Sequence, residues 1–341
     1  MADQIDFEER AIRWARMRYG DDARIAGFGA MPGNSGLSFG FEIRTGDTAT
    51  VDEVVVRLAP PGVKRSGNTD VLRQVPLLTL LAQSGVPVAP LVWHARESSS
   101  PFGTDTIVQR RMPGRSLSMF APAQRPGGGG LSIEDLVDKA VGALVKVHQV
   151  HPAGLTGGWG EAVPIERDLA YWFRLIDKVA DRELIELGTR LRDGLIEREP
   201  RSDRRGIYHG DYQTNNVLFT DDGEVSAIVD WEIAGIGYVG LDAGWMSMML
   251  DPTFWGPEHR ARMQVQLDPE VIRSSYEKYS GVRIGHFDWY RAYSGYRFGA
   301  IAAYNLRLHR TGRRPDPLYE VMASSIPRLF GRGLEVIEAQ R

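Results

Sequence analysis

The chain has 341 residues, enough for two domains, and its 43 % hydrophobic and 25 % charged residues are typical of a soluble globular protein. A formal net charge of −3 provides no basic field for nucleic acid, and the lack of cysteine excludes disulfides and thiolate metal sites. No apolar run is long enough to span a membrane and the acidic first residues lack a secretory core, so we expect a cytoplasmic monomer or homodimer without nucleic-acid or membrane partners.

The first third of the chain predicts a small antiparallel sheet with two helices. An amphipathic helix is expected over residues 6–19, and a second helical stretch over 69–83. Pro76 lies inside the second stretch and lacks a backbone N–H, so a kink or a restart is expected there. The predicted strands are residues 24–30, 38–44, 52–58, 91–95 and 105–110.

A glycine-rich turn separates the first two strands. It contains Gly33, Asn34, Ser35 and Gly36. Glycine has no Cβ and adopts positive φ, so such a turn can bring free backbone N–H groups close to phosphate oxygens. A plain hairpin turn is the alternative interpretation.

The strand over residues 52–58 places two kinds of side chain on its two faces. Strand alternation puts Val54, Val56 and Leu58 on one face. Val55 and Arg57 then lie on the other. A solvated arginine on a strand face is the alternative to a functional Arg57.

The second half of the chain is predicted to be mostly helical. After a glycine-rich insertion at 121–130, Ser132 and Asp135 form the pattern of a capping box, and a helix is expected to about residue 150. His148 and His151 lie three apart, but without a third ligand in reach we favour packing, or pairing with the dipole at the helix C-terminus, over a metal pair. Further helices are expected at 166–180, 182–198, 239–250, 269–280, 286–310 and 317–338.

The strongest chemical signal lies between these helices. The run from His209 to Asn216 follows an apolar strand end and places Asp211 and Asn216 five positions apart, and a second apolar run ends on Asp230. In ATP-dependent phosphoryl transfer, one carboxylate accepts the proton of the acceptor hydroxyl, while an Asn and a second Asp hold Mg²⁺. The pattern therefore predicts Asp211 as base and Asn216 with Asp230 as metal ligands. A hairpin loop in which Asp and Asn cap their own backbone is the alternative.

A formal G-x-G-x-x-G follows, at Gly235, Gly237 and Gly240. A dinucleotide-binding fold would need a further buried strand and an acidic residue about twenty positions on. Residues 251–257 are Asp-Pro-Thr-Phe-Trp-Gly-Pro, which is no strand. We therefore interpret the motif as a glycine-rich turn that leads into the next helix.

His209-Gly-Asp211-x-x-x-x-Asn216, with a downstream Ile-Val-Asp230-Trp, resembles the aminoglycoside phosphotransferase superfamily, which also holds choline, fructosamine, homoserine and macrolide kinases. The resemblance covers about residues 25 to 310. It implies an α+β, two-lobed, protein-kinase-like fold. Its nucleotide-binding lobe, residues 1–112, would hold the small antiparallel sheet. A mostly helical lobe, residues 113–341, would hold the catalytic loop and the acceptor pocket.

The resemblance also implies roles for individual residues. Val55 would lie beside adenine, and Arg57 would hold the nucleotide phosphates in place of the usual lysine. The main chain of the connector, Gln109, Arg110 and Arg111, would hydrogen-bond adenine. The helix of residues 69–83 offers no glutamate to pair with Arg57, since position 74 is Gln. His209 would orient the catalytic loop, and Asp242 would brace it.

We therefore predict a kinase that uses ATP and Mg²⁺ to phosphorylate a hydroxylated small molecule. Residues 251–341 contain 14 Lys and Arg against 10 Asp and Glu, an excess of four positive charges, which suits a neutral or anionic acceptor better than a polycationic aminoglycoside. A degenerate, nucleotide-binding regulator is an alternative, and an NAD(P)-dependent oxidoreductase is a more distant one. The intact Asp211, Asn216 and Asp230 favour the enzyme.

Overall fold

The computed structural model describes residues 2–31, 37–46, 49–120, 126, 130–155, 159–160, 162–179 and 181–339. They belong to two compact units, which are described one at a time. The first comprises residues 1–113, 153–159 and 226–233, and the second comprises 114–152, 160–225 and 234–341. The predicted division after residue 112 stays a prediction.

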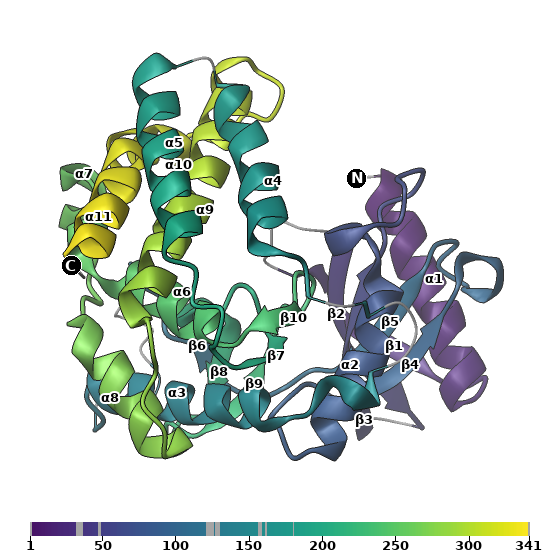
Figure 1. Cartoon of the computed structure of the whole chain (residues 1–341). Coiled ribbons are helices and arrows are strands. Elements are labelled where there is room, and N and C mark those ends of the chain that lie inside the picture. Colours follow the sequence, from purple (N-terminus) through teal and green to yellow (C-terminus); the bar gives the residue numbers. More distant parts are fainter. Residues whose placement is uncertain are drawn as a thin grey trace. The chain divides into compact units, whose positions relative to one another are not determined.

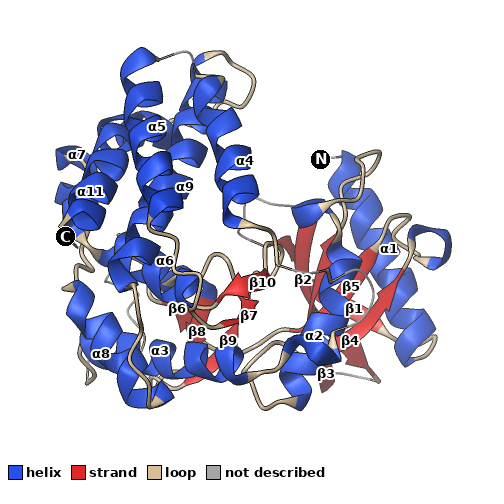
Figure 2. Ribbon diagram, viewed as in Figure 1, coloured by secondary structure: helices blue, strands red, loops and turns tan. Residues whose placement is uncertain are grey.

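The first unit is built on a five-stranded antiparallel sheet with the order β1-β2-β3-β5-β4. Figure 2 shows these strands in red. The bounds of the strands are β1 Arg24–Ala30, β2 Leu37–Thr45, β3 Ala49–Leu58, β4 Leu91–Ala95 and β5 Thr106–Arg110. The unit also contains two α-helices, α1 Ala2–Tyr19 and α2 Gln74–Gln83. The predicted small antiparallel sheet is confirmed.

The two faces of this sheet have separate cores. Trp14 of α1 is fully buried in one cluster, together with Val56 and Val108. Ile107, which alternates with Val108 along β5, belongs to the other cluster. Arg57 pairs with Ile107 across the strands, so Arg57 lies on the face opposite α1.

Pro76 has the effect that its missing N–H predicts. The chain from Gly67 to Arg73 forms two short 3₁₀ turns, and α2 begins at Gln74. Pro76 then lies in the first turn of α2, where a backbone N–H has no partner within the helix. Of the kink or restart expected in the helical stretch over 69–83, the structure shows the restart.

The second unit is mostly helical (Figure 1). Its strands are β6 Arg115–Ser116, β7 Arg205–Tyr208, β8 Val217–Phe219 and β10 Gly235–Tyr238, and β9 Val225–Ile228 starts in this unit and continues into the first. Its helices are α3 Ile133–Gln149, α4 Ile165–Asp177, α5 Arg182–Glu197, α6 Gly240–Leu250, α7 Pro257–Arg262, α8 Pro269–Ser280, α9 Phe287–Arg310, α10 Leu318–Met322 and α11 Ile326–Glu338. With the sheet of the first unit, this arrangement confirms the predicted α+β, two-lobed fold class.

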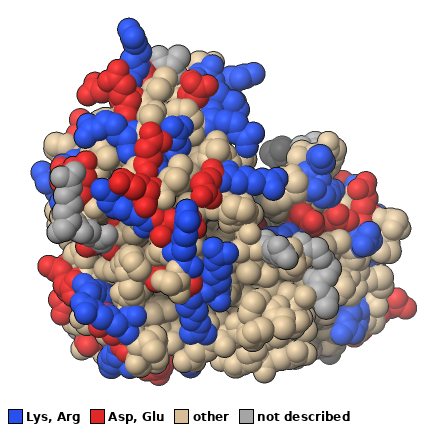
Figure 3. All heavy atoms as spheres, in the orientation of Figure 1, with Lys and Arg blue, Asp and Glu red and all other residues tan. Residues whose placement is uncertain are grey.

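Helix α9 is the centre of the second unit. Its 24 residues pack against α4, α5, α6, α10 and α11. Most of its side chains are buried on all sides, as expected for a helix enclosed by others. Acidic and basic side chains are interspersed over the face of this unit drawn in Figure 3. Among the described residues, no helix is long and apolar enough to cross a membrane.

Candidate active site

The loop that carries Asp211 is anchored between two short strands of the second unit. Ile207 of β7 is fully buried before the loop, and Val217 of β8 is fully buried after it. Gly210 has a φ of 88°, which a residue with a Cβ rarely adopts. The turn at Gly210 and the 3₁₀ turn Thr214–Asn216 therefore shape the loop.

Asp242 braces this loop from the first turn of α6. Its carboxylate accepts hydrogen bonds from the backbone N–H of His209 at 2.7 Å and of Gly210 at 2.8 Å. His148 Nε2 lies 3.1 Å from the same carboxylate, and its Nδ1 lies 2.9 Å from the hydroxyl of Tyr276. Burial raises the pKa of Asp242, but its hydrogen bonds and electrostatic interactions with His148 and His209 lower it by more, so the pKa lies below its ordinary value. Asp242 thus remains an anion that holds the backbone N–H groups of His209 and Gly210.

Three donors hold the side chain of Asp211. Its Oδ1 accepts from Trp245 Nε1 at 2.8 Å and from Gln213 Nε2 at 2.9 Å, and its Oδ2 accepts from Asn216 Nδ2 at 3.0 Å. Asn216 Nδ2 also donates to the backbone carbonyl of Asp211 at 2.9 Å. The structure therefore brings Asp211 and Asn216 into direct contact, and the engaged Nδ2 leaves the Asn216 carbonyl oxygen for other partners.

The side chain of a buried arginine contacts the same loop. Arg297 of α9 donates from Nη1 to the carbonyl of Gly210 at 2.8 Å. Its Cζ is 5.0 Å from the ring centroid of Trp172 and 4.9 Å from that of Trp245. Arg297 thus contacts the residue before Asp211 and the indole that bonds Asp211.

Arg57 and Asp230 meet in the first unit. Arg57 Nη2 donates to Asp230 Oδ1 at 2.9 Å and to Glu232 Oε2 at 3.0 Å. The backbone of Asp230 has a φ of 67°, in the left-handed region that few residues other than glycine adopt. Glu232 supplies the carboxylate partner of Arg57 for which the helix of residues 69–83 has no candidate.

The other residues predicted for the nucleotide lie on the internal strands β3 and β5 of the same sheet and directly after β5. Val55 pairs with Gln109 across β3 and β5, and the amide of Gln109 donates to the carbonyl of Ala89 at 2.9 Å. Arg110 forms an ion pair with Asp52 at 3.2 Å. Arg111 is exposed, and its N–H donates to the carbonyl of Glu53 at 2.8 Å. Gly33, Asn34, Ser35 and Gly36 lie outside the described residues.

The G-x-G-x-x-G stretch was expected to be a turn, and this expectation is wrong. Gly235–Tyr238 is strand β10, antiparallel to β7. A Cβ on Gly235 would lie 2.4 Å from the Tyr208 hydroxyl, and one on Gly240 would lie 2.2 Å from Tyr290 Cε2. The glycines therefore make room for tyrosine rings, and the antiparallel pairing contradicts the parallel βαβ unit of a dinucleotide-binding fold.

Four residues of this site were missed by sequence reasoning: His148, Glu232, Trp245 and Arg297. His148 was expected to pack or to pair with a helix end, and its contact with Asp242 joins residues 94 positions apart. Of these four residues, only Glu232 had a signal in the sequence, because it follows the predicted metal ligand Asp230 by two positions. Nothing in the local pattern marks Trp245 or Arg297 within their helices.

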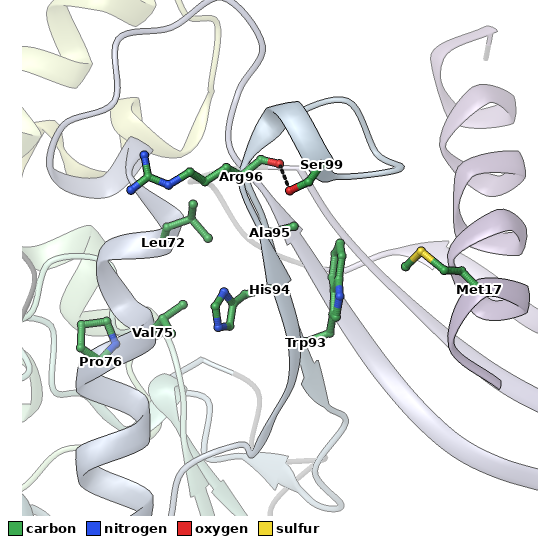
Figure 4. Close-up of a pocket in the computed structure, with 9 residues that line it drawn as sticks. All are labelled: Met17, Leu72, Val75, Pro76, Trp93, His94, Ala95, Arg96 and Ser99. Carbon is green, nitrogen blue, oxygen red and sulfur yellow. Dashed lines mark hydrogen bonds between the residues drawn. The ribbon is translucent and has the colours of Figure 1, made fainter.

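A hollow with a volume of about 780 Å³ lies elsewhere in the first unit (Figure 4). Its lining includes Met17 of α1, Trp93 and His94 of β4, and Val75 and Pro76 of α2. A second hollow, of about 610 Å³, lies in the second unit and includes Arg307 and Leu184 in its lining. Neither is lined by Asp211, Asn216, Arg57 or Asp230.

Asn216 of the second unit and Asp230 of the first both carry side-chain oxygens, the kind of ligand that Mg²⁺ binds. Across the described ranges, no three His, Cys, Asp or Glu side chains cluster as a metal site would require. Mg²⁺ bound together with nucleotide phosphates needs only one or two carboxylates from the protein. Binding of Mg²⁺ together with a nucleotide therefore does not require a site formed by protein ligands alone.

Known proteins resemble this chain in sequence. The model of a family described as the phosphotransferase enzyme family matches residues 30–279. Among curated proteins, mouse acyl-CoA dehydrogenase family member 10 is 24 % identical over 73 % of this chain, and chicken acyl-CoA dehydrogenase family member 11 is 26 % identical over 59 %. The chain spans about a quarter of the length of these relatives, 24 % of the first and 25 % of the second.

Solved structures share the fold. A candidate aminoglycoside phosphotransferase from Ralstonia eutropha has a TM-score of 0.73 and 21 % identity, covering 97 % of this chain and 98 % of that one. Plasmodium vivax ethanolamine kinase has a TM-score of 0.64 at 10 % identity, covering 98 % and 90 % of the two chains. The GDP complex of aminoglycoside 2'-phosphotransferase-IIIa has a TM-score of 0.63 at 13 % identity, covering 97 % of each.

Proposed function

Because the chain belongs to the phosphotransferase enzyme family, we propose that it transfers the γ-phosphoryl group of ATP, with Mg²⁺, to a hydroxyl group of a small molecule. The observation that carries this proposal is the fixed carboxylate of Asp211 on a loop braced by Asp242. In the reaction, the acceptor oxygen forms a bond to the γ-phosphorus, the bond from that phosphorus to ADP breaks, and the hydroxyl proton passes to Asp211.

Asp211 is the group that orients the hydroxyl and accepts its proton. Trp245, Gln213 and Asn216 fix the direction of its carboxylate, so little reorganisation is needed when the hydroxyl arrives. Each oxygen already accepts a hydrogen bond, so the carboxylate is held in one orientation. Such positioning suits a transfer in which orientation and charge stabilisation dominate.

Asn216 and Asp230 are the proposed ligands of Mg²⁺. The Nδ2 group of Asn216 is engaged by Asp211, so its carbonyl oxygen is the atom available to a cation. When bound, the ion neutralises charge on the phosphate oxygens. Asp230 is ion-paired with Arg57 in the first unit, so metal binding there replaces one positive partner with another.

The remaining roles concern the nucleotide. Arg57, held by Glu232, would contact the phosphates together with the backbone of residues 33–36. Val55 and residues 109–111 would contact adenine. His209 accepts a hydrogen bond from the Asp211 N–H at its Nδ1, at 3.2 Å, and so orients the loop without a proton-transfer role.

The acceptor proposed here is neutral or anionic, and kanamycin-type polycations are expected to be poor acceptors. The excess of basic residues over 251–341 and the buried Arg297 beside the Asp211 loop both disfavour an ammonium-rich ligand. A degenerate nucleotide-binding regulator is the second candidate function. It is favoured by Arg57, which replaces the usual lysine and is ion-paired with the proposed metal ligand Asp230.

The test is an ADP-release assay with Mg·ATP, preceded by calorimetric titration of nucleotides with and without Mg²⁺. Acceptor-stimulated ADP release from a neutral or anionic alcohol supports the enzyme. Tight Mg·ATP binding without release for any alcohol in a broad panel would instead favour the regulator. Saturable phosphorylation of kanamycin at micromolar concentration would contradict the acceptor class.

A further inference from the structure

Arg297 is a buried cation in the second unit that the proposed transfer does not otherwise use. It lies in the middle of α9, and only 8 % of its surface is exposed. The guanidinium contacts the aromatic faces of Trp172 and Trp245. Since arginine stays protonated in proteins, a full positive charge is enclosed beside the catalytic loop.

This charge has no carboxylate partner within ion-pair distance among the described residues. Its hydrogen bond to the Gly210 carbonyl uses one of its five N–H donors, and its Nε is buried without a partner. Asp168, on α4, accepts hydrogen bonds from Trp172 and from the hydroxyl of Tyr293, and it forms no ion pair with Arg297. Enclosing a charge without a counter-charge is unfavourable, so its retention calls for a reason.

Arg291, six residues earlier on the same helix, provides a contrast. It is 5 % exposed, and its guanidinium is paired with Asp251 and Asp288. The fold therefore supplies a buried carboxylate, Asp251, and a partly exposed one, Asp288, to this arginine of α9. Arg297 has no such partner within ion-pair distance among the described residues, so its counter-charge is left for a ligand to supply.

The position of Arg297 connects it to the reacting hydroxyl. It bonds the carbonyl of Gly210, the residue before Asp211, and it lies against Trp245, whose Nε1 bonds Asp211. A group held by this guanidinium would therefore belong to the same small molecule as a hydroxyl at Asp211. A planar fork of N–H donors matches carboxylate and phosphate oxygens.

Resting on the proposed phosphotransferase function, we infer that Arg297 binds an anionic group of the acceptor, and that the acceptor is an alcohol carrying a carboxylate or a phosphate. The transfer itself is unchanged, since the anionic group takes part in no bond making or breaking. Tryptophan rings would otherwise suit a quaternary ammonium group. The guanidinium already contacts both rings, so a cationic alcohol such as choline is disfavoured.

The experiment compares matched alcohols on the full chain with Mg·ATP. The probes are 3-hydroxybutyrate and 4-hydroxybutyrate, their amides, glycerol 3-phosphate and choline, and the readout is kcat/KM from ADP release. Wild type is expected to prefer the acids over their amides by about 10²-fold, because the amides cannot form the charged hydrogen bonds. A comparison of kcat/KM between glycerol 3-phosphate and the hydroxybutyrates shows whether the anionic group is a phosphate or a carboxylate.

Variants separate recognition from loop positioning. Arg297→Gln should reduce kcat/KM for the anionic alcohols toward that of the amides and leave the KM for ATP unchanged. Arg297→Lys should restore part of the preference, because it keeps the charge without the planar fork. Arg307→Gln, on the same helix and outside the site, is the matched control and should keep the wild-type preference.

An equal loss for every acceptor in Arg297→Gln would show that Arg297 only positions Gly210, and would overturn the inference. So would a wild-type preference for amides or choline, or a lack of stimulation by every anionic alcohol of the panel. None of these results would contradict phosphoryl transfer. Failure of the chain to bind Mg·ATP by calorimetry would contradict the proposed function itself.

Discussion

At the scale of single residues, Asp211 is where a small chemical change should have the largest kinetic effect. Asp211→Asn keeps the size of the side chain but removes the charge and places an N–H₂ group among three donors, from Trp245, Gln213 and Asn216. Turnover should fall by about 10²- to 10⁴-fold, the usual contribution of a positioned base. The affinity for nucleotide should change little, as measured by calorimetry.

The matched control for Asp211→Asn is Asp221→Asn, a substitution of the same type at a carboxylate that is 86 % exposed. It should leave turnover unchanged. Transfer at the wild-type rate in Asp211→Asn would remove Asp211 from the reaction.

The two proposed metal ligands should respond differently to truncation. Asp230 carries a full charge, whereas Asn216 presents a neutral carbonyl oxygen. Asp230→Ala should abolish the Mg²⁺-dependent part of ATP binding, and Asn216→Ala should weaken it and be partly rescued by higher Mg²⁺. Calorimetric titration with Mg·ATP checks both, and equal binding by wild type and Asp230→Ala would exclude Asp230 as a ligand.

The difference between what local sequence predicts and what it cannot is visible at this scale. Asp211, Asn216 and Asp230 were identifiable because their order, spacing and apolar flanks are local properties of the chain. The bonds from His148 to Asp242 and from Arg297 to Gly210 join residues 94 and 87 positions apart. Such pairs depend on how helices pack, which a single sequence does not encode in any short window.

At the scale of elements, patterns with a hydrogen-bonding basis were predicted well. The capping box of Ser132 and Asp135 is formed by both of its reciprocal bonds, and α3 begins directly after Ser132. The continuous helix expected over 317–338 is wrong, because the chain breaks into α10 and α11 around Ala323–Ser325, just before Pro327. Proline favours the first turn of a helix, so Pro327 marks a start there.

Glycine was the least reliable signal, because the same residue serves turns and close packing. Gly240→Ala tests the packing role, since its Cβ would lie 2.2 Å from Tyr290 Cε2 between α6 and α9. Overpacking of this kind should lower the free energy of unfolding by about 1–3 kcal/mol. Urea denaturation followed by tryptophan fluorescence measures it.

Gly331→Ala is the matched substitution, in α11. Nothing lies within 4 Å of the Cβ that it would add. Replacing a helical glycine by alanine should stabilise the protein by up to about 1 kcal/mol. A Gly240→Ala variant as stable as wild type would contradict the packing role of Gly240.

At the scale of the whole molecule, two short segments from later in the chain belong to the first unit. Local sequence patterns do not predict which unit such a segment joins. Residues 153–159 belong to the first unit, where the ring of Trp159 lies 3.8 Å from the guanidinium of Arg73 and its Nε1 bonds the Arg73 carbonyl. Residues 226–233 also belong to it, and Ile228 donates to the carbonyl of Pro87 at 2.7 Å. Both segments join partners that lie far away in sequence.

A buried histidine makes the stability of the second unit depend on pH. His259 of α7 is 4 % exposed, it stacks on Trp255 with ring centroids 4.0 Å apart, and its Nε2 is buried without a hydrogen-bond partner. Burial lowers the pKa of His259 from 6.5 to about 4, with a smaller contribution from the charge of Arg262. The folded state therefore binds a proton at His259 less readily than the unfolded chain does.

The sign of the effect follows from proton binding. Between pH 6.5 and about 4, the unfolded state binds more protons at His259 than the folded state does. The free energy of unfolding therefore increases as the pH rises through this window and decreases as the pH falls through it. At about 1.4 kcal/mol per pKa unit, the loss is on the order of 3 kcal/mol. His259→Phe should flatten this part of the pH profile in urea denaturation at constant ionic strength. Arg262→Gln, which leaves the burial of His259 in place, should keep most of the slope. A wild-type profile that is already flat between pH 6.5 and 4.5 would show that the imidazole is protonated in the fold at little cost.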